Sequence, residues 1–329
     1  MRKIRLEAFG GPEVLEVRDM PRPVCPDDGY LIETRAVGLN FAELVERRGR
    51  YRKDQQVPYE MGKEAAGVVI ERGPNATRFA VGDAVIAVKF NNGCYAEIVD
   101  ATEAQVIRPP KGLSFVEMAA FANTFGTAWY AIHEQARVRP GESMLIQAAA
   151  GGVGTAAVML SKALGCAPII GTAGSDDKCR LVESLGADAC VNYRDTDFRE
   201  TVRKLTNGRG VDFCLESVGG EVYERSLEVL APVGRLIIIG FSSITKDYAN
   251  AIPRLHPLTL FHRSIQVGGL NVDNLKYQTQ HAFWDGLIAH VEAHGLKPLV
   301  GLTLPFEQAA EAHRALESRA TTGKVVLTM

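Results

Sequence analysis

The stretch IQAAAGGVGTAAVMLSKALG, residues 146–165, decides the fold of this chain. It starts at the end of an apolar segment, passes through a run of very small residues, and continues as a sequence of helical character. A loop of this kind between a strand and a helix either cradles a phosphate group or only lets the helix pack closely on a sheet. The surrounding sequence has to separate the two interpretations.

Apolar runs recur around this loop with helical patterns between them. They are SMLIQ, APIIGT, ACVNY, VDFCLES, GRLIIIG and SIQVGGL, which together span residues 143–270. Continuous apolar strands separated by helices indicate a parallel sheet that is covered on both faces. We therefore predict a doubly wound, Rossmann-type α/β domain over residues 123–265.

The first part of the chain has a different texture. YLIETRAVG, from Tyr30, alternates apolar and polar residues, and AAGVVIERG, GDAVIAVKF and CYAEIVDA follow, each bounded by Gly, Pro or Asn. This pattern predicts an antiparallel sheet or an irregular barrel. Near the C-terminus we expect helices around 275–294 and 305–320 and a last strand over 324–329. These elements are expected to return to the first domain, so that 1–122 and 266–329 form one discontinuous domain.

Composition narrows the class of protein. The 329 residues favour two domains, and 37 Lys and Arg against 39 Asp and Glu leave no cationic surface that would indicate nucleic acid or an acidic membrane. No apolar run approaches the roughly 18 residues that cross a bilayer. No apolar segment follows the basic N-terminal residues, and the six cysteines are scattered without a C-x-x-C pair. We expect a cytoplasmic protein with reduced cysteines.

The small-residue loop fits a dinucleotide-binding fingerprint in which alanine replaces the first glycine. Ala149, Gly151 and Gly154 occupy the three glycine positions of G-x-G-x-x-G. Gly151 would let the backbone approach a pyrophosphate, and Gly154 would let the helix pack closely on the strand. The alternative is a packing turn without a ligand, which the six-strand pattern disfavours. The predicted pyrophosphate-binding residues are Ala150, Gly151, Gly152, Val153 and Gly154.

The second strand indicates which dinucleotide is bound. An NAD site usually ends this strand with Asp or Glu, which binds the ribose, but here it ends at Thr172 and Ala173. Asp176 and Asp177 follow where they are expected to cap the next helix. Lys178, Tyr193 and Arg194 are suited to surround a 2′-phosphate, although Lys178 is also consistent with a solvated helix position. The sequence thus favours NADPH over NADH.

These features resemble the zinc-free quinone oxidoreductase (zeta-crystallin-like) branch of the medium-chain dehydrogenase/reductase superfamily. The resemblance covers essentially the whole chain, and IPRLHPLTLFHRSIQVGGL is most similar to the vesicle amine transport protein relatives within that branch. It implies a GroES-like β-rich domain beside the Rossmann domain, and a homodimer that pairs the edge strand near SIQVGGL. The blocks that carry it are GGPEVLEV, AVGLNFAELVERRGRY, GKEAAGVVIERG, VGDAVIAV, GTAWYAI, AAAGGVG, LGAD, VDFCLESVGG, GRLIIIG and GKVVL.

Zinc members of the superfamily carry Gly-His-Glu where this chain has Gly62, Lys63 and Glu64. Their cysteine ligand matches Asn40, and the four-cysteine structural lobe has no counterpart. An ammonium offers zinc no lone pair, and the metal needs three or four suitable ligands, so neither zinc site is expected. Glu64 is expected to have a structural role such as an internal ion pair. Lys324 either reaches the cleft or is an ordinary strand-start residue.

Without a Lewis acid, the substrate must already accept hydride readily, as quinones and polarised enones do. The resemblance implies that Asn40, Tyr51 and Thr127 border the nicotinamide and the substrate. The remaining cofactor contacts that it implies are Gly174, Gly240, Phe241, Ser242, Gly269, Leu270 and Asn271. The predicted function is therefore an NADPH-dependent reductase of quinones or related activated carbonyl compounds.

Two alternatives remain open. In related enoyl-thioester reductases, a tyrosine that matches Tyr51 is taken as the proton donor, which would make this chain an NADPH-dependent enoyl-thioester or enone reductase. The other is a protein that holds NADPH with little turnover. Two residues also have an alternative role of their own: Tyr51 only packs against the cofactor, as in the quinone-reducing relatives, and Asn40 is only a turn residue that bonds its own backbone.

Overall fold

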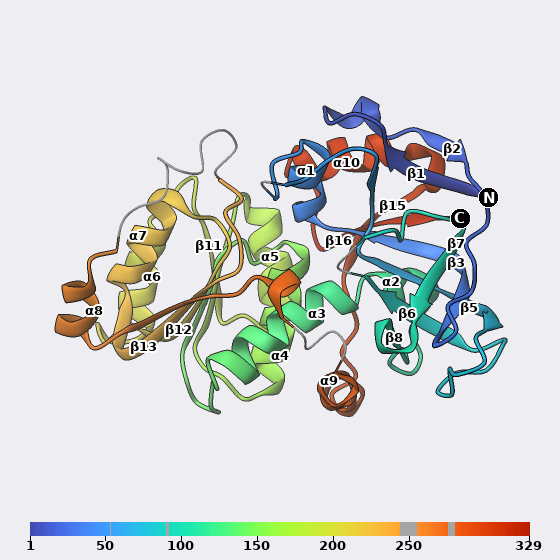
Figure 1. Ribbon diagram of the computed structural model, residues 1–329. Helices are drawn as coiled ribbons and strands as arrows, with labels where there is room; N and C mark the ends of the chain where they lie inside the picture. The colour runs from blue at the N-terminus through green and yellow to red at the C-terminus, as the bar shows by residue number, and fades with distance from the viewer. Residues whose placement is uncertain (53, 90–91, 244–254, 276–279) are drawn as a thin grey trace. The chain divides into compact units, whose positions relative to one another are not determined.

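The computed structural model describes residues 1–329 except 53, 90–91, 244–254 and 276–279 (Figure 1). The chain divides into two compact units, a first unit of Met1–Gly126 with Asp273–Met329 and a second unit of Thr127–Val272. The divisions follow Gly126 and Val272, whereas the sequence predicts them at 122 and 265. The later second division has a physical origin, because the strand Gln266–Gly269 pairs with a strand of the second unit.

The second unit is built on a six-stranded sheet in which every neighbouring pair is parallel. The order is β11-β10-β9-β12-β13-β14, so the first strand of the unit lies beside the fourth and the order reverses between β9 and β12. All six predicted strands are confirmed. They are β9 (Met144–Ile146), β10 (Ile169–Ala173), β11 (Ala189–Asn192), β12 (Val211–Glu216), β13 (Leu230–Ile238) and β14 (Gln266–Gly269).

Helices cover both faces of this sheet, with α4 and α5 on one face and α6 and α7 on the other (Figure 1). The buried side chains of α6, Phe198 and Val202, lie one helical turn apart and pack into the core beside Leu145 and Leu236. The helices are α3 (Ala122–Trp129), the π-helix η3 (Tyr130–Gln135), α4 (Gly152–Ala163), α5 (Asp176–Ser184), α6 (Phe198–Leu205), α7 (Gly220–Glu228) and α8 (Pro257–Arg263). The predicted Rossmann-type architecture is thereby confirmed.

The first unit contains a seven-stranded sheet, with the path β15-β16-β3-β5-β6-β8 and with β7 paired to β3. All pairs are antiparallel except β15 with β16. Because β16 pairs with β3, the C-terminal strand lies inside the sheet of the N-terminal segment. The strands are β3 (Gly29–Leu39), β5 (Glu64–Arg72), β6 (Ala84–Val88), β7 (Ile98–Thr102), β8 (Val106–Ile107), β15 (Val300–Pro305) and β16 (Lys324–Thr328).

Short elements complete the first unit. A three-stranded sheet has the order β2-β1-β4 (Val17–Asp19, Arg2–Leu6 and Tyr59–Glu60). The helices are α1 (Phe41–Arg47), α2 (Phe115–Ala119), α9 (His281–Ala293) and α10 (Ala309–Glu317), with the 3-10 turns η1 (Pro12–Val14), η2 (Glu103–Gln105), η4 (Val272–Asn274) and η6 (Phe306–Gln308). The helix predicted around 275–294 is α9, and residues 276–279 of that prediction lie outside the described residues. The helix predicted at 305–320 is η6 followed by α10.

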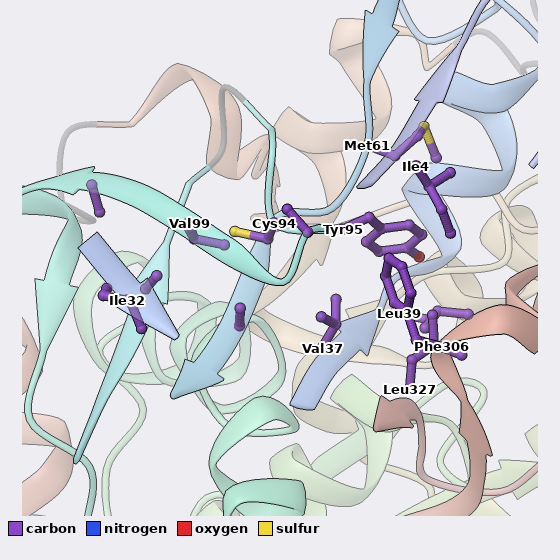
Figure 2. Packing of buried hydrophobic residues seen from close by; sticks show 14 of the residues in the cluster. Ile4, Ile32, Val37, Leu39, Met61, Cys94, Tyr95, Val99, Phe306 and Leu327 are labelled. Atoms are coloured by element: carbon purple, nitrogen blue, oxygen red, sulfur yellow. The ribbon is translucent and has the colours of Figure 1, made fainter. Parts of the chain in front are cut away.

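The core of the first unit joins the two chain segments. Figure 2 shows Tyr95 among Ile4, Leu39, Phe306 and other side chains that are almost fully buried. Burying a large apolar side chain stabilises a fold by roughly 1.5–3 kcal/mol. No helix in the described part of the chain is long and apolar enough to cross a membrane. All six cysteines are free thiols.

Candidate active site and cofactor site

The small-residue loop leads directly into α4 of the second unit. Gly151 is the N-cap of this helix, and no side chain of the described residues caps its first turn. The first-turn N–H groups of a helix lack partners within it, and its positive dipole end attracts anions. A Cβ on Gly151 would meet only the Ala148 oxygen, at 3.4 Å, whereas a Cβ on Gly154 would lie 2.4 Å from that oxygen. Gly151 therefore leaves room for a ligand, and Gly154 permits the close helix packing.

The end of β10 carries no carboxylate. The Thr172 hydroxyl donates to the Gln147 side chain at 2.6 Å, and Ala173 is the last residue of the strand. The expectation that Asp176 and Asp177 cap α5 is wrong. Ser175 has the extended backbone that an N-cap requires and accepts the Lys178 N–H, while both aspartates lie in the first helical turn.

A cationic corner lies beside this strand end. The ring of Tyr193 lies over Gly174, because a Cβ on this glycine would stand 2.6 Å from the tyrosine oxygen. Burial, followed by the positive charge of Arg194, lowers the pKa of Lys178. Two cations and a half-exposed phenol thus gather where the strand lacks an acid, an arrangement suited to a phosphate group.

The other predicted cofactor residues follow β13 and β14. Ser242 donates its N–H to the Ser217 oxygen at 2.9 Å, so the segment of Gly240, Phe241 and Ser242 lies against the end of β12. Leu270 donates its N–H to Ile238, and the Gly269 oxygen accepts from Gln135. Asn271 follows β14, and Thr127 is buried within α3. These residues all belong to the second unit.

Asn40 lies in a buried polar cluster of the first unit. It is the N-cap of α1, and its backbone N–H donates to Glu43. The side-chain oxygen accepts from Lys324 at 2.5 Å and from Asn123, and the side-chain nitrogen donates to the Gly38 oxygen at 3.4 Å and to Glu43 at 3.2 Å. The amide is therefore fixed in one orientation.

Glu64 and Lys324 form the ion pair that the sequence analysis expects for Glu64. The Lys324 ammonium lies 2.5 Å from one Glu64 oxygen, and the Asn123 backbone N–H donates to the other at 2.9 Å. Both charged side chains are buried, with exposed fractions of 4% and 1%. Lys324 is thus the first residue of β16 and also reaches the cluster around Asn40.

Lys63 belongs to a second buried cluster. Its ammonium is 2.9 Å from Glu46 and 3.0 Å from both oxygens of Asp273, and it lies over the Tyr51 ring at 4.9 Å from the centroid. Arg52 also pairs with Asp273, at 3.2 Å. One buried ammonium thus joins α1 to the segment at which the chain returns to the first unit.

The surroundings of Tyr51 change its acidity. Burial, the negative charge of Asp273 and a hydrogen bond to that carboxylate all raise the pKa of Tyr51. The pKa of Glu46 is likewise raised to about 7, chiefly by burial and against the effect of Lys63. The cluster therefore favours a neutral phenol whose O–H is directed at Asp273.

A third buried network, formed by Tyr95, His313 and Arg47, also contacts α1. The Tyr95 hydroxyl donates to Glu43 at 2.6 Å and lies 3.1 Å from Nε2 of His313, while Arg47 lies 3.3 Å from Nδ1. Burial and then the charge of Arg47 lower the pKa of His313 to about 3, which keeps the ring neutral. The network fixes the helix that carries Glu43 and Glu46.

Sequence reasoning missed several of these partners. Glu43 and Glu46 lie in the block AVGLNFAELVERRGRY, which carries the family resemblance. Their spacing of three residues on a helix is the pattern that could have indicated that the two carboxylates lie on one face. Asp273 is more than 200 positions from Lys63, and no local pattern connects them. Asn123 likewise had no signal, since its role comes from its contacts with Asn40 and Glu64.

Comparisons with known proteins agree with this architecture. The profile "Alcohol dehydrogenase GroES-like domain" matches residues 26–159, and "Zinc-binding dehydrogenase" matches residues 152–285. Human quinone oxidoreductase is 31% identical over 331 residues, which cover 100% of this chain and 98% of that protein.

Solved structures resemble the whole chain. Escherichia coli quinone oxidoreductase complexed with NADPH has a TM-score of 0.89 at 28% identity and full coverage of both chains. The CurK enoyl reductase has a TM-score of 0.88 at 30% identity, covering 100% of this chain and 99% of its own. A human synaptic vesicle membrane protein VAT-1 homolog-like protein has a TM-score of 0.86 at 27% identity, with coverages of 100% and 98%.

The GroES-like and Rossmann-type units, with a glycine loop at the head of α4, define an oxidoreductase of the medium-chain dehydrogenase/reductase class. Such a class contains several families with different substrates. Full-length identity of 31% shows that the chain belongs to the quinone oxidoreductase family. The resemblance stated from the sequence is thereby confirmed.

One matching profile is named for zinc binding, but the residues of this chain at the zinc-ligand positions do not suit a zinc ion. At the histidine position, the Lys63 ammonium is bound by Glu46 and Asp273. At the cysteine position, the Asn40 oxygen accepts from the Lys324 ammonium, which also pairs with Glu64 next to the histidine position. Zinc requires lone pairs that point into one centre, and a second cation repels it.

Proposed function

We propose that this chain is a zinc-independent reductase that transfers hydride from NADPH to quinones or related activated carbonyl compounds. One observation carries the proposal: an ammonium stands at the histidine position and a second binds the Asn40 oxygen at the cysteine position, in a chain whose dinucleotide loop is preserved. Such a site favours substrates that accept hydride without a metal. The relatives named quinone oxidoreductase support the same substrate class.

The second unit supplies the proposed cofactor site. NADPH, when bound, supplies the hydride. The loop residues Ala150–Gly154 would receive the pyrophosphate at the head of α4, and Gly174, Lys178 and Tyr193 would surround the 2′-phosphate. The nicotinamide end is assigned to the residues that follow β13 and β14, namely Gly240, Phe241, Ser242, Gly269, Leu270 and Asn271.

On the substrate side, Asn40, Tyr51 and Thr127 remain the proposed residues. Asn40 already donates to Gly38 and Glu43, so its proposed role depends on the exact position in which this network holds it. Tyr51 is proposed to shape the pocket wall rather than to give up its proton, because its O–H is directed at Asp273. Thr127 contributes a neutral hydroxyl.

Reduction of an enoyl thioester or enone is the second candidate. The likeness to the CurK enoyl reductase favours it, and the raised pKa of Tyr51 opposes it. A protein that binds NADPH with little turnover is the third, because the glycine loop that supports cofactor binding does not by itself require turnover. The fold and the glycine loop are common to all three, so turnover has to decide.

We also propose that the protein works in the cytoplasm as a homodimer. The outermost strand β14 lies at one end of the parallel sheet. On α8, which precedes β14 in the chain, Leu258 and Phe261 are 55% and 76% exposed. An unpaired edge strand and exposed apolar side chains are both surfaces that a second copy can cover.

The proposed function is tested by steady-state oxidation of NADPH with a small quinone and, side by side, with an enoyl thioester, each repeated with NADH. We expect quinone-dependent turnover and a preference for NADPH. Lys178→Ala should reduce that preference, whereas Lys204→Ala on α6 should leave it unchanged. Turnover with the enoyl thioester alone would favour the second candidate. NADPH binding without turnover would favour the third.

A further inference from the structure

Asn40, which matches the cysteine ligand of the zinc members, and Glu64, which follows the histidine position, converge here on an ammonium from the last strand of the chain. We propose that Lys324 is a positioning residue that replaces the metal ion: it fixes the Asn40 amide and balances the charge of Glu64. This inference rests on the proposed function for its effect on turnover, because Asn40 is a proposed substrate-side residue. It goes beyond that function by assigning the cation that organises the site.

The sheet register brings the three residues together. In the pairing of β16 with β3, Val325 lies opposite Leu39, so Lys324 and Asn40 are the next residues at the ends of the two strands. In the pairing of β3 with β5, Gly38 lies opposite Glu64. Three adjacent strands thus deliver Lys324, Asn40 and Glu64 to one place. The Lys324 ammonium lies 2.5 Å from an oxygen of each partner.

The ammonium is the charged one of the groups that set which way the Asn40 amide is turned. An ammonium has only donors, so it must face the amide oxygen and not the amide nitrogen. The Asn123 side chain donates to the same oxygen, and the amide nitrogen then faces Gly38 and Glu43. Without the ammonium, the amide oxygen loses its one charged donor and keeps only the Asn123 amide, so the Asn40 side chain is held less firmly in its place. Lys324 therefore acts on the substrate side through Asn40.

Charge balance is the second part of the role. Glu64 is 1% exposed, and its named partners are the Lys324 ammonium and the Asn123 backbone N–H. A buried carboxylate that loses its cation is strongly destabilising. Lys63 does not take this part, because its ammonium is held by Glu46 and Asp273. The lysine at the histidine position is thus a different cation from the one that meets Asn40 and Glu64.

The test compares Lys324→Met, the double variant Lys324→Met with Glu64→Gln, and Lys297→Met, which changes an exposed lysine paired with Glu117. For each we would measure kcat and KM with a quinone, the Kd for NADPH by fluorescence, and the unfolding midpoint. Lys324→Met should lose on the order of 100-fold in kcat, the scale seen when a group at the substrate is displaced by about 1 Å, with the Kd for NADPH within about twofold. The double variant should recover the midpoint but not kcat. Lys297→Met should behave as wild type.

The outcomes separate the inference from the proposed function. Wild-type kcat in Lys324→Met, or recovery of kcat in the double variant, would overturn the positioning role and leave charge balance alone. If the wild-type protein turns over no quinone, the proposed function fails. The inference is then decided by a crystal structure of Lys324→Met. A turned or displaced Asn40 amide would support it, and an unmoved Asn40 would overturn it.

Discussion

Tyr51 is the residue whose surroundings distinguish most sharply between the two candidate reactions. Its phenol is bonded to Asp273, and burial raises its pKa, so proton donation to a substrate is disfavoured. We expect Tyr51→Phe to change kcat for quinone reduction by less than about threefold, because the ring contact with Lys63 is retained. Steady-state kinetics check this, with Tyr59→Phe as the matched control. A loss of 100-fold or more, confined to enoyl thioesters, would show that Tyr51 is the acid.

Glu46 should leave a signature in the pH dependence of stability. Burial raises its pKa to about 7 from the ordinary 4.5, so between these values the folded state holds a proton that the unfolded state has released. This contribution to the free energy of unfolding is complete below about pH 4.5 and is lost as the pH rises through 7. Glu46→Gln removes it. The stability of the variant relative to wild type should thus rise by on the order of 3 kcal/mol between pH 4 and 8.

The measurement is denaturant unfolding of both proteins at several pH values across this interval. Glu200→Gln, an exposed change on α6, controls for the general effect of removing a carboxylate. A constant difference between Glu46→Gln and wild type would mean that the pKa of Glu46 is the same in the folded and unfolded states. The Lys63 ammonium would then offset the cost of burial.

At the scale of elements, α4 depends on the absence of a side chain at Gly154. A Cβ there would lie 2.4 Å from the Ala148 oxygen and 2.7 Å from Ala149 Cα, which are both backbone atoms. Gly154→Ala must therefore push the head of α4 away from the loop. We expect the Kd for NADPH to rise tenfold or more and the unfolding midpoint to fall.

Gly286→Ala is the matched control, since it makes the same change in the exposed interior of α9, where a Cβ meets nothing within 4 Å. Alanine is the better helix former, so this variant should gain roughly 0.5–1 kcal/mol with no effect on NADPH. Fluorescence titration and thermal unfolding of both variants check the pair. Equal effects at the two positions would contradict the packing account of Gly154.

Sequence patterns located the elements better than they located the site. The six parallel strands were predictable because each is a continuous apolar run between helices, and the glycine loop because its spacing is local. The N-cap of α5 was misassigned to aspartates because Ser175 precedes two equally good capping residues. The Lys63–Asp273 and Lys324–Asn40 contacts could not be predicted. The first forms because the chain comes back to the first unit at Asp273, and the second because of the register between β16 and β3, and no local sequence pattern shows either.

At the scale of the whole molecule, the exposed face of α8 should decide the oligomeric state. Phe261, on the helix that precedes the outermost strand β14, is 76% exposed, and covering it would remove a large apolar area from water. We expect light scattering after size exclusion to show a particle of twice the 35.7 kDa chain mass. Phe261→Glu should weaken the dimer by at least tenfold, since a buried aromatic anchor is worth more than about 1 kcal/mol. Val81→Glu, which changes a 63% exposed side chain in the first unit, should not. If the wild-type protein is a monomer, the homodimer proposal is wrong. If Phe261→Glu forms the dimer as well as wild type does, the interface does not include α8.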